Sequence, residues 1–566
     1  MLRCLRRIGT RLACLAALTA SLGGCQYLVF LRAPEKPRPP GPSSTERGRA
    51  FNGVAARTMP DESSDWPAYN RSFTGVRFSP LSQITTANVG TLRPVCHFDL
   101  GERANFQSAP VVVAGIMYFT TALNTYAIDA ASCALIWRHT YVFRPAPPFD
   151  PNNTNRGVGY LGSPDGARIF RGANDGRVLA LDAHTGRQVW NVVAADPLRG
   201  ETISAAPVAW GNLVYIGNAG GDNYGVTGRI MAFDANTGGR VWSTELVART
   251  GEASRSWPPE KETMPRGGGA TWTTYTLDTT TATLYVSTGN PLPDFVGEPR
   301  AGANLYTTSV VALDARTGAI RTHYVVLEGD VHDWDVAAAP VLTVTRSGRE
   351  IVAAAGKDGH LYVFDRASRA RLFRTPVTTI ENVEAPLTEK GTRFCPGVNG
   401  GTEWNGPAFS PQTNAFYVNA VDWCTTVRVS AKKLRNVKGL PWTGSAERFV
   451  PFGANDTTSR GWMTAVDAED GSVRWKYESP TPLVAGVTPT KGGVVFSGDL
   501  RGIFFALDAE TGRQLFQYDT GRPIGGGVVT YQVNGRQLVA VASGLNSPVA
   551  WKLESSPARV VVFGLP

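Results

Sequence analysis

Methionine and charged residues are scarce in this chain of 566 residues. It has six methionines, and Asp, Glu, Lys and Arg together make up 18% of the sequence. So few methionines argue against a helical bundle. Glycine (61), proline (38) and tryptophan (14) are instead plentiful, as expected for many turns and aromatic-rich strands. The composition therefore predicts a large all-β protein.

A long apolar run is also missing. The most apolar segment, LACLAALTASL (12–22), is too short to span a bilayer and follows four arginines, so residues 1–24 are predicted to be a secretory signal. The LGGC at its end resembles a bacterial lipobox, in which Cys25 would carry a lipid anchor. Ordinary cleavage nearby, with Cys25 left as a stray thiol or removed, is the alternative. Gln26 is compatible with the outer membrane, so we expect a periplasmic protein anchored there rather than at the inner membrane.

The remaining chain divides into a tether and a domain. Residues 25–60 combine proline, serine and charge with little to bury, which predicts a flexible tether, and residues 61–566 are predicted to form the β domain. The formal net charge of +9 falls to +5 when the four arginines of the signal are removed. Such a mildly basic chain gives no indication of nucleic-acid binding, and solubility is the simplest interpretation.

Cysteine is also rare, and no Cys-x-x-Cys-His motif occurs, which excludes a covalent c-type haem on this chain. Three of the seven cysteines lie in residues 1–25. In an oxidising compartment the other four are expected to form disulfides, although three connectivities are possible in principle. We predict the pairs Cys96–Cys133 and Cys395–Cys424.

A repeat is the strongest positive signal. Seven copies are plain, among them VLALDAHTGRQVW (178–190), IMAFDANTGGRVW (230–242) and FFALDAETGRQLF (504–516). Each has an alternating apolar strand that ends in Asp, a turn, and a second strand that closes on an aromatic residue, which is the pattern of a β-hairpin. The aspartate is expected to cap its turn. The aromatic residues are expected to pack between neighbouring units rather than to bind ligand; they include Trp137, Trp190, Trp242 and Trp475.

The spacing of the repeats predicts the architecture. A gap of 102 residues separates Asp365 from Asp467, and we interpret FYVNAVDWC (416–424) as a degenerate copy inside it. Eight units of about fifty residues result, and units of this length bury their faces by stacking around an axis. The sequence therefore predicts an eight-bladed β-propeller with four-stranded blades.

Residues that break the repeat are the candidates for chemistry. They gather in five stretches: NTNRGVGYL (153–161), YIGNAGGDNYGVTG (215–228), GGGATW (267–272), STGNPLP (287–293) and VLEGDVHDWDVAAAP (326–340). Singly, each could be a turn or a solvated loop. Together, Asn290, Asp335 and an acid near position 222 offer the hard oxygen donors that Ca²⁺ accepts.

An ordered set of motifs then resembles a known family. NRG (155–157), GGGATW, STGNP, HDWD (332–335), GKDGHLYVFDR (356–366) and the Cys395/Cys424 pair are similar to the quinoprotein alcohol dehydrogenases, whose cofactor is pyrroloquinoline quinone. The resemblance extends from about Asp65 to the C-terminus. It implies that Asp335 is the catalytic base and approaches the metal, that Asn290 is a calcium ligand, and that the quinone is bound by Trp272 through stacking and by Arg156, Ser204 and Lys357.

The chain also departs from the family pattern. GGDNYG stands where the family has a glutamate ligand, so Asp222 or Asn223 takes that position; we prefer Asp222, since a carboxylate keeps the site anionic. An adjacent cysteine pair is missing, and no late aromatic is visible in LVAGVTPTKGG (483–493). We interpret Asp333 and Glu328 as surface acids. Family members that use lanthanides have a further aspartate where this chain has Ala337, so the resemblance implies calcium.

Two functions are consistent with these features. The first is an exported oxidoreductase that oxidises an alcohol or sugar-like substrate with pyrroloquinoline quinone and Ca²⁺. Because the chain lacks a haem motif, its electrons would pass to a separate carrier such as a soluble cytochrome c, and the lipid anchor would be its contact with the membrane. The second is a cofactor-free lipoprotein propeller similar to the factors that assist outer-membrane barrel assembly. Such scaffolds resemble the bare repeats, without the GGGATW, STGNP and HDWD segments.

Overall fold

The computed structural model describes residues 63–143, 153–163, 166–430, 432, 434–446, 453–548, 550–553 and 556–566. The predicted signal (1–24), Cys25 and the predicted tether (25–60) lie outside the described residues. Within the described part of the chain, the helices are too short and too polar to cross a bilayer. They are four 3-10 turns: η1 (Val89–Thr91), η2 (Pro197–Arg199), η3 (Glu252–Ser256) and η4 (Glu298–Arg300).

The described residues form an all-β structure. Eight sheets in this part of the chain have four antiparallel strands, and five of these, each made of strands consecutive in sequence, come first. Their strands are β2 (Val111–Val113), β3 (Ile116–Thr120), β4 (Asn124–Asp129) and β5 (Leu135–Thr140); β6 (Gly159–Leu161), β7 (Arg168–Ala173), β8 (Arg177–Asp182) and β9 (Gln188–Val193); β10 (Val208–Trp210), β11 (Leu213–Gly217), β12 (Arg229–Asp234) and β13 (Arg240–Glu245); β14 (Thr276–Asp278), β15 (Thr283–Ser287), β16 (Ser309–Asp314) and β17 (Ile320–Val325); β18 (Val341–Val344), β19 (Glu350–Ala355), β20 (His360–Asp365) and β21 (Arg371–Pro376).

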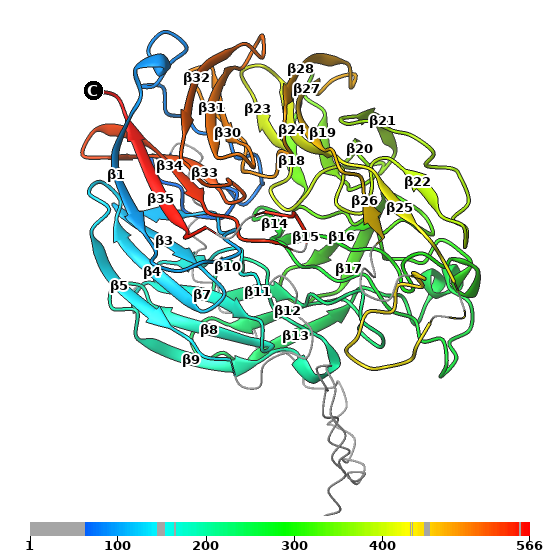
Figure 1. Cartoon of the computed structure of the whole chain (residues 1–566). Coiled ribbons are helices and arrows are strands. Elements are labelled where there is room, and N and C mark those ends of the chain that lie inside the picture. The colour runs from blue at the N-terminus through cyan, green and yellow to red at the C-terminus, as the bar shows by residue number, and fades with distance from the viewer. Residues whose placement is uncertain are drawn as a thin grey trace, which may run out of the picture. The chain divides into compact units, whose positions relative to one another are not determined.

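The other three four-stranded sheets lie later in the chain. They contain β23 (Ala408–Ser410), β24 (Ala415–Asp422), β27 (Arg460–Asp467) and β28 (Val473–Ser479); β29 (Thr488–Pro489), β30 (Val494–Gly498), β31 (Ile503–Asp508) and β32 (Gln514–Asp519); and β33 (Val528–Val533), β34 (Arg536–Ser543), β35 (Arg559–Gly564) and β1 (Arg93–Asp99). In Figure 1 the sheets follow one another in chain order around a common centre, so that β35 (red) lies beside β1 (blue). This is the arrangement of a β-propeller.

The predicted repeat hairpin forms the third and fourth strands of seven of these sheets. In the hairpin β8–β9, Asp182 Oδ1 accepts hydrogen bonds from the backbone nitrogen and the hydroxyl of Thr185, both at 2.8 Å. The closing Trp190 is buried and its Nε1 donates to the carbonyl of Ala235, in the next repeat, at 3.0 Å. Both predicted structural roles, the turn cap and the packing between units, are confirmed.

The tryptophan also explains the glycine of the repeat. Gly238, in the turn after β12, has φ +75°, and a Cβ at this position would lie 2.9 Å from the Trp190 ring. The same contact recurs between Gly186 and Trp137, at 2.6 Å. In these two units the turn position is glycine because the aromatic residue of the preceding unit packs directly against it.

The predicted degenerate copy is wrong. Residues 416–424 contribute β24, which pairs with β27 in the same sheet as the hairpin at 463–475. The four-stranded sheet that has no repeat hairpin is instead the one in which β1 pairs with β35. The sequence did not predict this sheet, because its strands lack the Asp-turn motif and come from the two ends of the domain.

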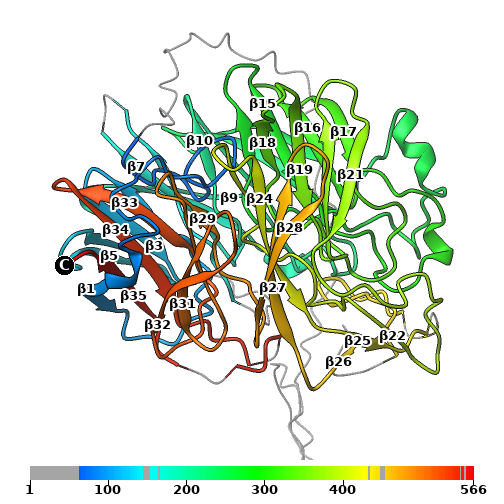
Figure 2. The same cartoon turned by 90° about the horizontal axis from the view of Figure 1, so that it is seen from above.

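Both predicted disulfides are present: Cys96–Cys133 with a Cα–Cα distance of 5.8 Å, and Cys395–Cys424 with 4.4 Å. The second joins the ends of two strands of a three-stranded sheet, β22 (Thr392–Phe394), β25 (Thr425–Val427) and β26 (Ala454–Asn455). In Figure 2 this sheet lies outside the four-stranded sheets. The 102-residue gap is thus filled by an accessory sheet fastened by a disulfide.

Candidate functional site

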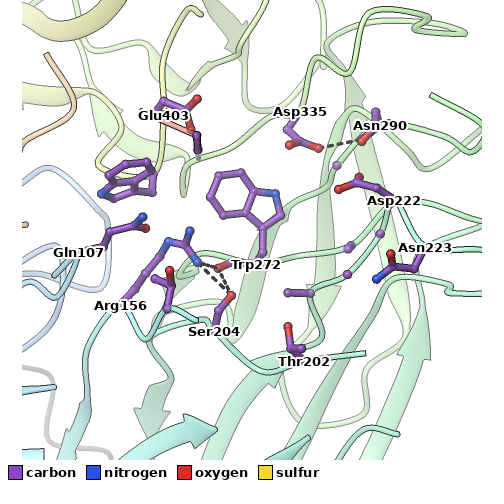
Figure 3. Close-up of a pocket in the computed structure, with 18 of the residues that line it drawn as sticks. Gln107, Arg156, Thr202, Ser204, Asp222, Asn223, Trp272, Asn290, Asp335 and Glu403 are labelled. Carbon is purple, nitrogen blue, oxygen red and sulfur yellow. Dashed lines mark hydrogen bonds between the residues drawn. The ribbon is translucent and has the colours of Figure 1, made fainter. Parts of the chain in front are cut away.

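One pocket contains all seven residues predicted to bind cofactor or metal or to act as the base. Its cavity volume is about 220 Å³, and Figure 3 shows it. The walls also carry small residues such as Gly221, Ala270 and Gly289. The seven predicted residues that line it are Arg156, Ser204, Asp222, Trp272, Asn290, Asp335 and Lys357.

Sheet topology explains why these distant residues meet. Each lies either in the loop before the first strand of its sheet, like Arg156 and Asp335, or between the second and third strands, like Asn290 and Lys357. In an antiparallel sheet both kinds of loop leave at one end, which we call the pocket end. The repeat turns, between the third and fourth strands, lie at the opposite end, which we call the turn end.

Asp335 is held by two donors. Its Oδ1 accepts the backbone N–H of Asn290 at 3.0 Å, and its Oδ2 lies 2.8 Å from Lys357 Nζ. The same ammonium is 3.9 Å from Asp333 Oδ1. Although burial lowers it, the carboxylates of Asp333 and Asp335 hold the pKa of Lys357 well above its usual range. The lysine is therefore charged and fixes the Asp335 carboxylate in the pocket.

Gly289 allows this arrangement. A Cβ at position 289 would lie 2.5 Å from Asp335 Oδ1, so any other residue would push the carboxylate away from the backbone of Asn290. The glycine and the asparagine of the STGNP motif thus have separate roles: the first provides space for the carboxylate and the second donates to it.

A cluster of three carboxylates lies beside Asp335. One oxygen from each of Asp222, Asp294 and Asp333 lies within 4.8 Å of the others. Asp294 is fully buried and its Oδ1 accepts from Asn290 Nδ2 at 3.0 Å, whereas its Oδ2 has no hydrogen-bond donor among the described residues. A buried carboxylate oxygen without a donor is costly unless a cation compensates it.

The electrostatics of the cluster indicate the same deficit of positive charge. Burial, and then the charge of Asp335, raise the pKa of Asp222 to about 6. Burial, and then the charge of Asp222, raise the pKa of Asp294 well above its usual range. Burial also raises the pKa of Asp333, in spite of the nearby Lys357. A hard metal ion among these oxygens would remove the mutual repulsion, so the donor set fits one.

Sequence reasoning misjudged part of this cluster. Asp333, interpreted as a surface acid, is 5% exposed and belongs to the cluster, whereas Glu328 is exposed as predicted. Asp294 was missed, although it lies only four residues after Asn290. Of the two alternatives at GGDNYG, the geometry supports Asp222, since the side-chain nitrogen of Asn223 donates to the carbonyl of Gly200 at 3.0 Å.

A cation and an aromatic ring form the other side of the pocket. Arg156 Cζ lies 4.5 Å from the centroid of the Trp272 ring, and Lys357 Nζ lies 5.7 Å from it. Arg156 Nη1 donates to the Trp272 carbonyl at 2.8 Å and to Ser204 Oγ at 2.9 Å. In Figure 3 the Trp272 ring stands between Arg156 and the acids Asp222 and Asp335. A flat anionic molecule fits such a ring bordered by cations.

Sequence reasoning also missed several lining residues. Trp404 Nε1 donates to the Gly525 carbonyl at 2.8 Å, and its ring meets that of Trp551 edge to face at 5.9 Å. None of residues 483–493 is among the lining residues, whereas Trp551, from the loop before β35, is one of them. Glu403 adds a buried carboxyl, and burial raises its pKa to about 7.

Comparison with known proteins matches this architecture. A family model described as the glucose/ethanol/alcohol dehydrogenase β-propeller domain matches residues 66–386, and a model for the outer membrane protein assembly factor BamB matches residues 459–561. The first spans more than half of the chain. The chain belongs to the quinoprotein alcohol dehydrogenase family.

Relatives and solved structures of this family match most of the chain. A quinohemoprotein alcohol dehydrogenase of Comamonas testosteroni is 31% identical over 88% of this chain and 74% of the relative. A lanthanide-dependent methanol dehydrogenase of Methylacidiphilum fumariolicum is 30% identical over 78% of each. Among solved structures, a europium-containing methanol dehydrogenase has a TM-score of 0.79 and 28% identity, covering 89% of this chain and 99% of that one.

Proposed function

We propose that this member of the quinoprotein alcohol dehydrogenase family oxidises an alcohol or sugar-like substrate with pyrroloquinoline quinone and a metal ion bound in the pocket. The convergence of seven predicted residues from separate loops on one cavity carries the proposal. The repeats alone would not support it, because they account only for the turn end. When bound, the quinone and its metal ion would supply the hydride acceptor and the Lewis acid.

The residues present fit both groups. Asp222, Asn290 and Asp335 would hold the metal ion, and the orphaned oxygen of Asp294 indicates that the cluster lacks a cation. Trp272 would support one face of the quinone. The quinone's acidic groups would be bound by the side chains that already border this ring, Arg156, Ser204 and Lys357.

Asp335 is the residue we propose as the base. Its carboxylate would accept the hydroxyl proton of the substrate. The backbone of Asn290 and the ammonium of Lys357 each bind one of its oxygens, so the carboxylate is held in one orientation. Trp404 and Trp551 give the pocket an apolar wall that would exclude water from the substrate.

Finer features of the protein belong to the same proposal. Each four-stranded sheet would be one blade, so the propeller of residues 61–566 would have eight blades, closed by the pairing of β1 with β35. Cys25 would carry the lipid anchor and place the enzyme in the periplasm at the outer membrane. Electrons would leave to a soluble cytochrome c or another separate acceptor.

The assembly-factor scaffold is the weaker alternative. The matching model covers residues 459–561, a range that contains Trp551 but none of the seven predicted site residues. A scaffold also offers no reason for the cluster of Asp222, Asp294 and Asp333 beside the pocket. The repeats that these propellers share explain the match.

Reconstitution tests the proposed function. Purified protein stripped of metal is mixed with pyrroloquinoline quinone and CaCl₂, and unbound quinone is removed. We expect retained quinone absorbance at one equivalent, followed by reduction of an artificial dye with some members of a panel of primary alcohols and aldoses. Protein that retains no quinone would contradict the proposal and favour the scaffold.

A further inference from the structure

A segment near the start of the described chain runs across the inner strands of several sheets. We call residues 66–79 the axial segment. Its backbone hydrogen bonds reach the first strands of five sheets, at Val112 (β2), Leu277 (β14), Leu342 (β18), Phe409 (β23) and Pro489 (β29). Each of these strands starts at the pocket end and runs to the turn end, so the axial segment lies behind the pocket, on the side of the turn end.

Tyr69, in the axial segment, contacts loops that belong to four different sheets. It packs with Ala109 and Ala206 in one buried cluster, and a Cβ on Gly157 would lie 3.6 Å from its Cδ2. Its hydroxyl donates to Asn405 Oδ1 at 3.0 Å. A single side chain can touch loops of four sheets only near their common centre. Tyr69, which is 3% exposed, therefore fills that centre.

Each of these four contacts lies one or two residues beyond a residue that lines the pocket. The lining residues are Gln107, Arg156, Ser204 and Trp404, of which the first three are labelled in Figure 3. In each loop the chain runs from the pocket toward the first strand of its sheet. Tyr69 therefore lies directly behind the lining residues and supports the floor of the pocket.

Asn405 links the tyrosine to the wall of the pocket. Its Nδ2 donates to the carbonyls of Val484 at 2.8 Å and Gly525 at 3.2 Å. Trp404 Nε1 donates to the same Gly525 carbonyl at 2.8 Å. The hydroxyl of Tyr69 orients the Asn405 amide for these bonds, because its loss would leave the buried amide oxygen to seek another donor by rotating.

Arg77 holds the tyrosine in place. Its side chain is 1% exposed, donates to Asn70 Oδ1 at 2.6 Å and lies 5.9 Å from the centroid of the Tyr69 ring. Burial raises the pKa of Tyr69 to about 12, although nearby arginine charges oppose the rise. The hydroxyl is therefore protonated at neutral pH and remains a donor to Asn405.

We propose that Tyr69 is a positioning residue of the pocket, which closes the centre of the propeller behind it and, through Asn405, fixes the wall that carries Trp404. The inference rests on the proposed function and adds a residue that lies behind the lining residues rather than among them. A wall that is already fixed need not be ordered when the quinone binds, so the quinone is held more tightly.

The test removes the hydroxyl alone, with Tyr69→Phe. The protein in CaCl₂ is titrated with pyrroloquinoline quinone while the quenching of tryptophan emission is recorded. We expect the dissociation constant of the quinone to rise by about 10-fold, because a buried acceptor loses its donor. Tyr531→Phe is the matched control, since it removes another buried hydroxyl, which donates to the Ala130 carbonyl at 2.7 Å between two sheets. It should leave the dissociation constant unchanged.

A double variant shows whether the tyrosine acts through the asparagine. Asn405→Ala should itself weaken quinone binding, because it removes the bonds to Val484 and Gly525. If Tyr69 acts through Asn405, adding Tyr69→Phe to Asn405→Ala should weaken binding no further. The same titration of the two single variants and the double variant measures this.

Two results would overturn the inference: Tyr69→Phe and Tyr531→Phe that bind the quinone equally well, or losses that add in the double variant. If Tyr69→Phe does not fold, the unmodified protein still decides. Coupling is reciprocal, so quinone binding must in turn stabilise the axial segment. We expect amides of residues 66–79 to exchange hydrogen at least about 5-fold more slowly with quinone bound, relative to those of the hairpin 178–190. An unchanged ratio would refute the coupling.

The same samples separate this inference from the proposed function. Unmodified protein that binds no quinone would refute the proposed function and the inference with it. Unmodified protein that binds the quinone, together with a Tyr69→Phe variant that binds it equally well, would refute the inference alone.

Discussion

The turn end and the pocket end of the same sheets differ in how their charged side chains are paired. At the turn end, Asp182 accepts from residues two and three positions later in its own hairpin, and Asp234 and Asp314 do the same. At the pocket end, Asp335 and Lys357 pair across the gap between two loops, and Asp294 keeps an oxygen for which the described residues supply no donor. Hydrogen bonds between residues close in sequence stabilise the fold at the turn end. The charges that remain uncompensated after folding lie at the pocket end, where a ligand can bind them.

The largest effect is expected from a change at the pocket end. Asp335→Asn should lower kcat by about 10²- to 10⁴-fold, because the amide cannot accept the substrate proton. The melting temperature should change little, since the residue contributes to no strand. Dye-linked kinetics of the reconstituted protein and a thermal melt measure the two quantities. A folded variant that keeps its activity would show that Asp335 is not the base.

A substitution near the turn end should instead lower stability and leave quinone binding unchanged. Trp190→Ala should reduce the free energy of unfolding by about 3–5 kcal/mol, because it empties the space between two sheets and leaves the Ala235 carbonyl without its donor. Quinone retention per folded molecule should be unchanged. Denaturant unfolding measures the loss, with Trp190→Phe as the control. A variant that loses quinone binding but keeps its stability would contradict the assignment of separate roles to the two ends.

A buried acid of the pocket should make stability depend on pH. Burial is the main reason that the pKa of Glu403 is raised to about 7, with Lys357 and Arg156 opposing the rise and Asp335 adding to it. The folded state therefore holds the proton more tightly than the unfolded chain, so stability is greatest below the unfolded pKa and is lost as the pH rises through about 7.

Glu403→Gln removes that dependence. Relative to the unmodified metal-free protein, the variant should gain about 1–3 kcal/mol of unfolding free energy at pH 8 and much less at pH 5. Urea unfolding at both values measures it. An equal difference at the two pH values would mean that the glutamate does not titrate in this range.

The turn end and the pocket end also differ in how far the sequence could predict them. The hairpins at the turn end depend on residues close in sequence, so Asp182, Trp190 and their equivalents could be assigned before the structure was known. The sheet that contains β1 and β35 could not, because its pairing joins residues more than 400 positions apart. No short sequence motif indicates a contact between residues so far apart in the chain.

The pocket was predictable only where a short motif marked it. Asn290 and Asp335 stand in unusual segments, whereas Asp294, Glu403 and Trp551 occur in ordinary loop sequences. Asp333 was misjudged because an acid in a polar run is usually solvated. Only the topology, which brings every such loop to one end of its sheet, shows that these side chains are neighbours.

The smallest effect should come from a single turn cap. Asp182→Ala removes the acceptor of the Thr185 bonds. The expected loss of unfolding free energy is about 1 kcal/mol, because the freed groups at this rim can bind water instead.

Hydrogen bonds from Thr185 also hold the pKa of Asp182 below its usual range, despite partial burial. The carboxylate therefore adds stability above its unfolded pKa that is lost on acidification, and Asp182→Ala should remove this small contribution at neutral pH. Asp182→Asn keeps an acceptor and serves as the control in denaturant unfolding at pH 7. If Asp182→Ala instead abolished quinone retention, the turn end would be coupled to the pocket, and the separation of fold from chemistry between the two ends would fail.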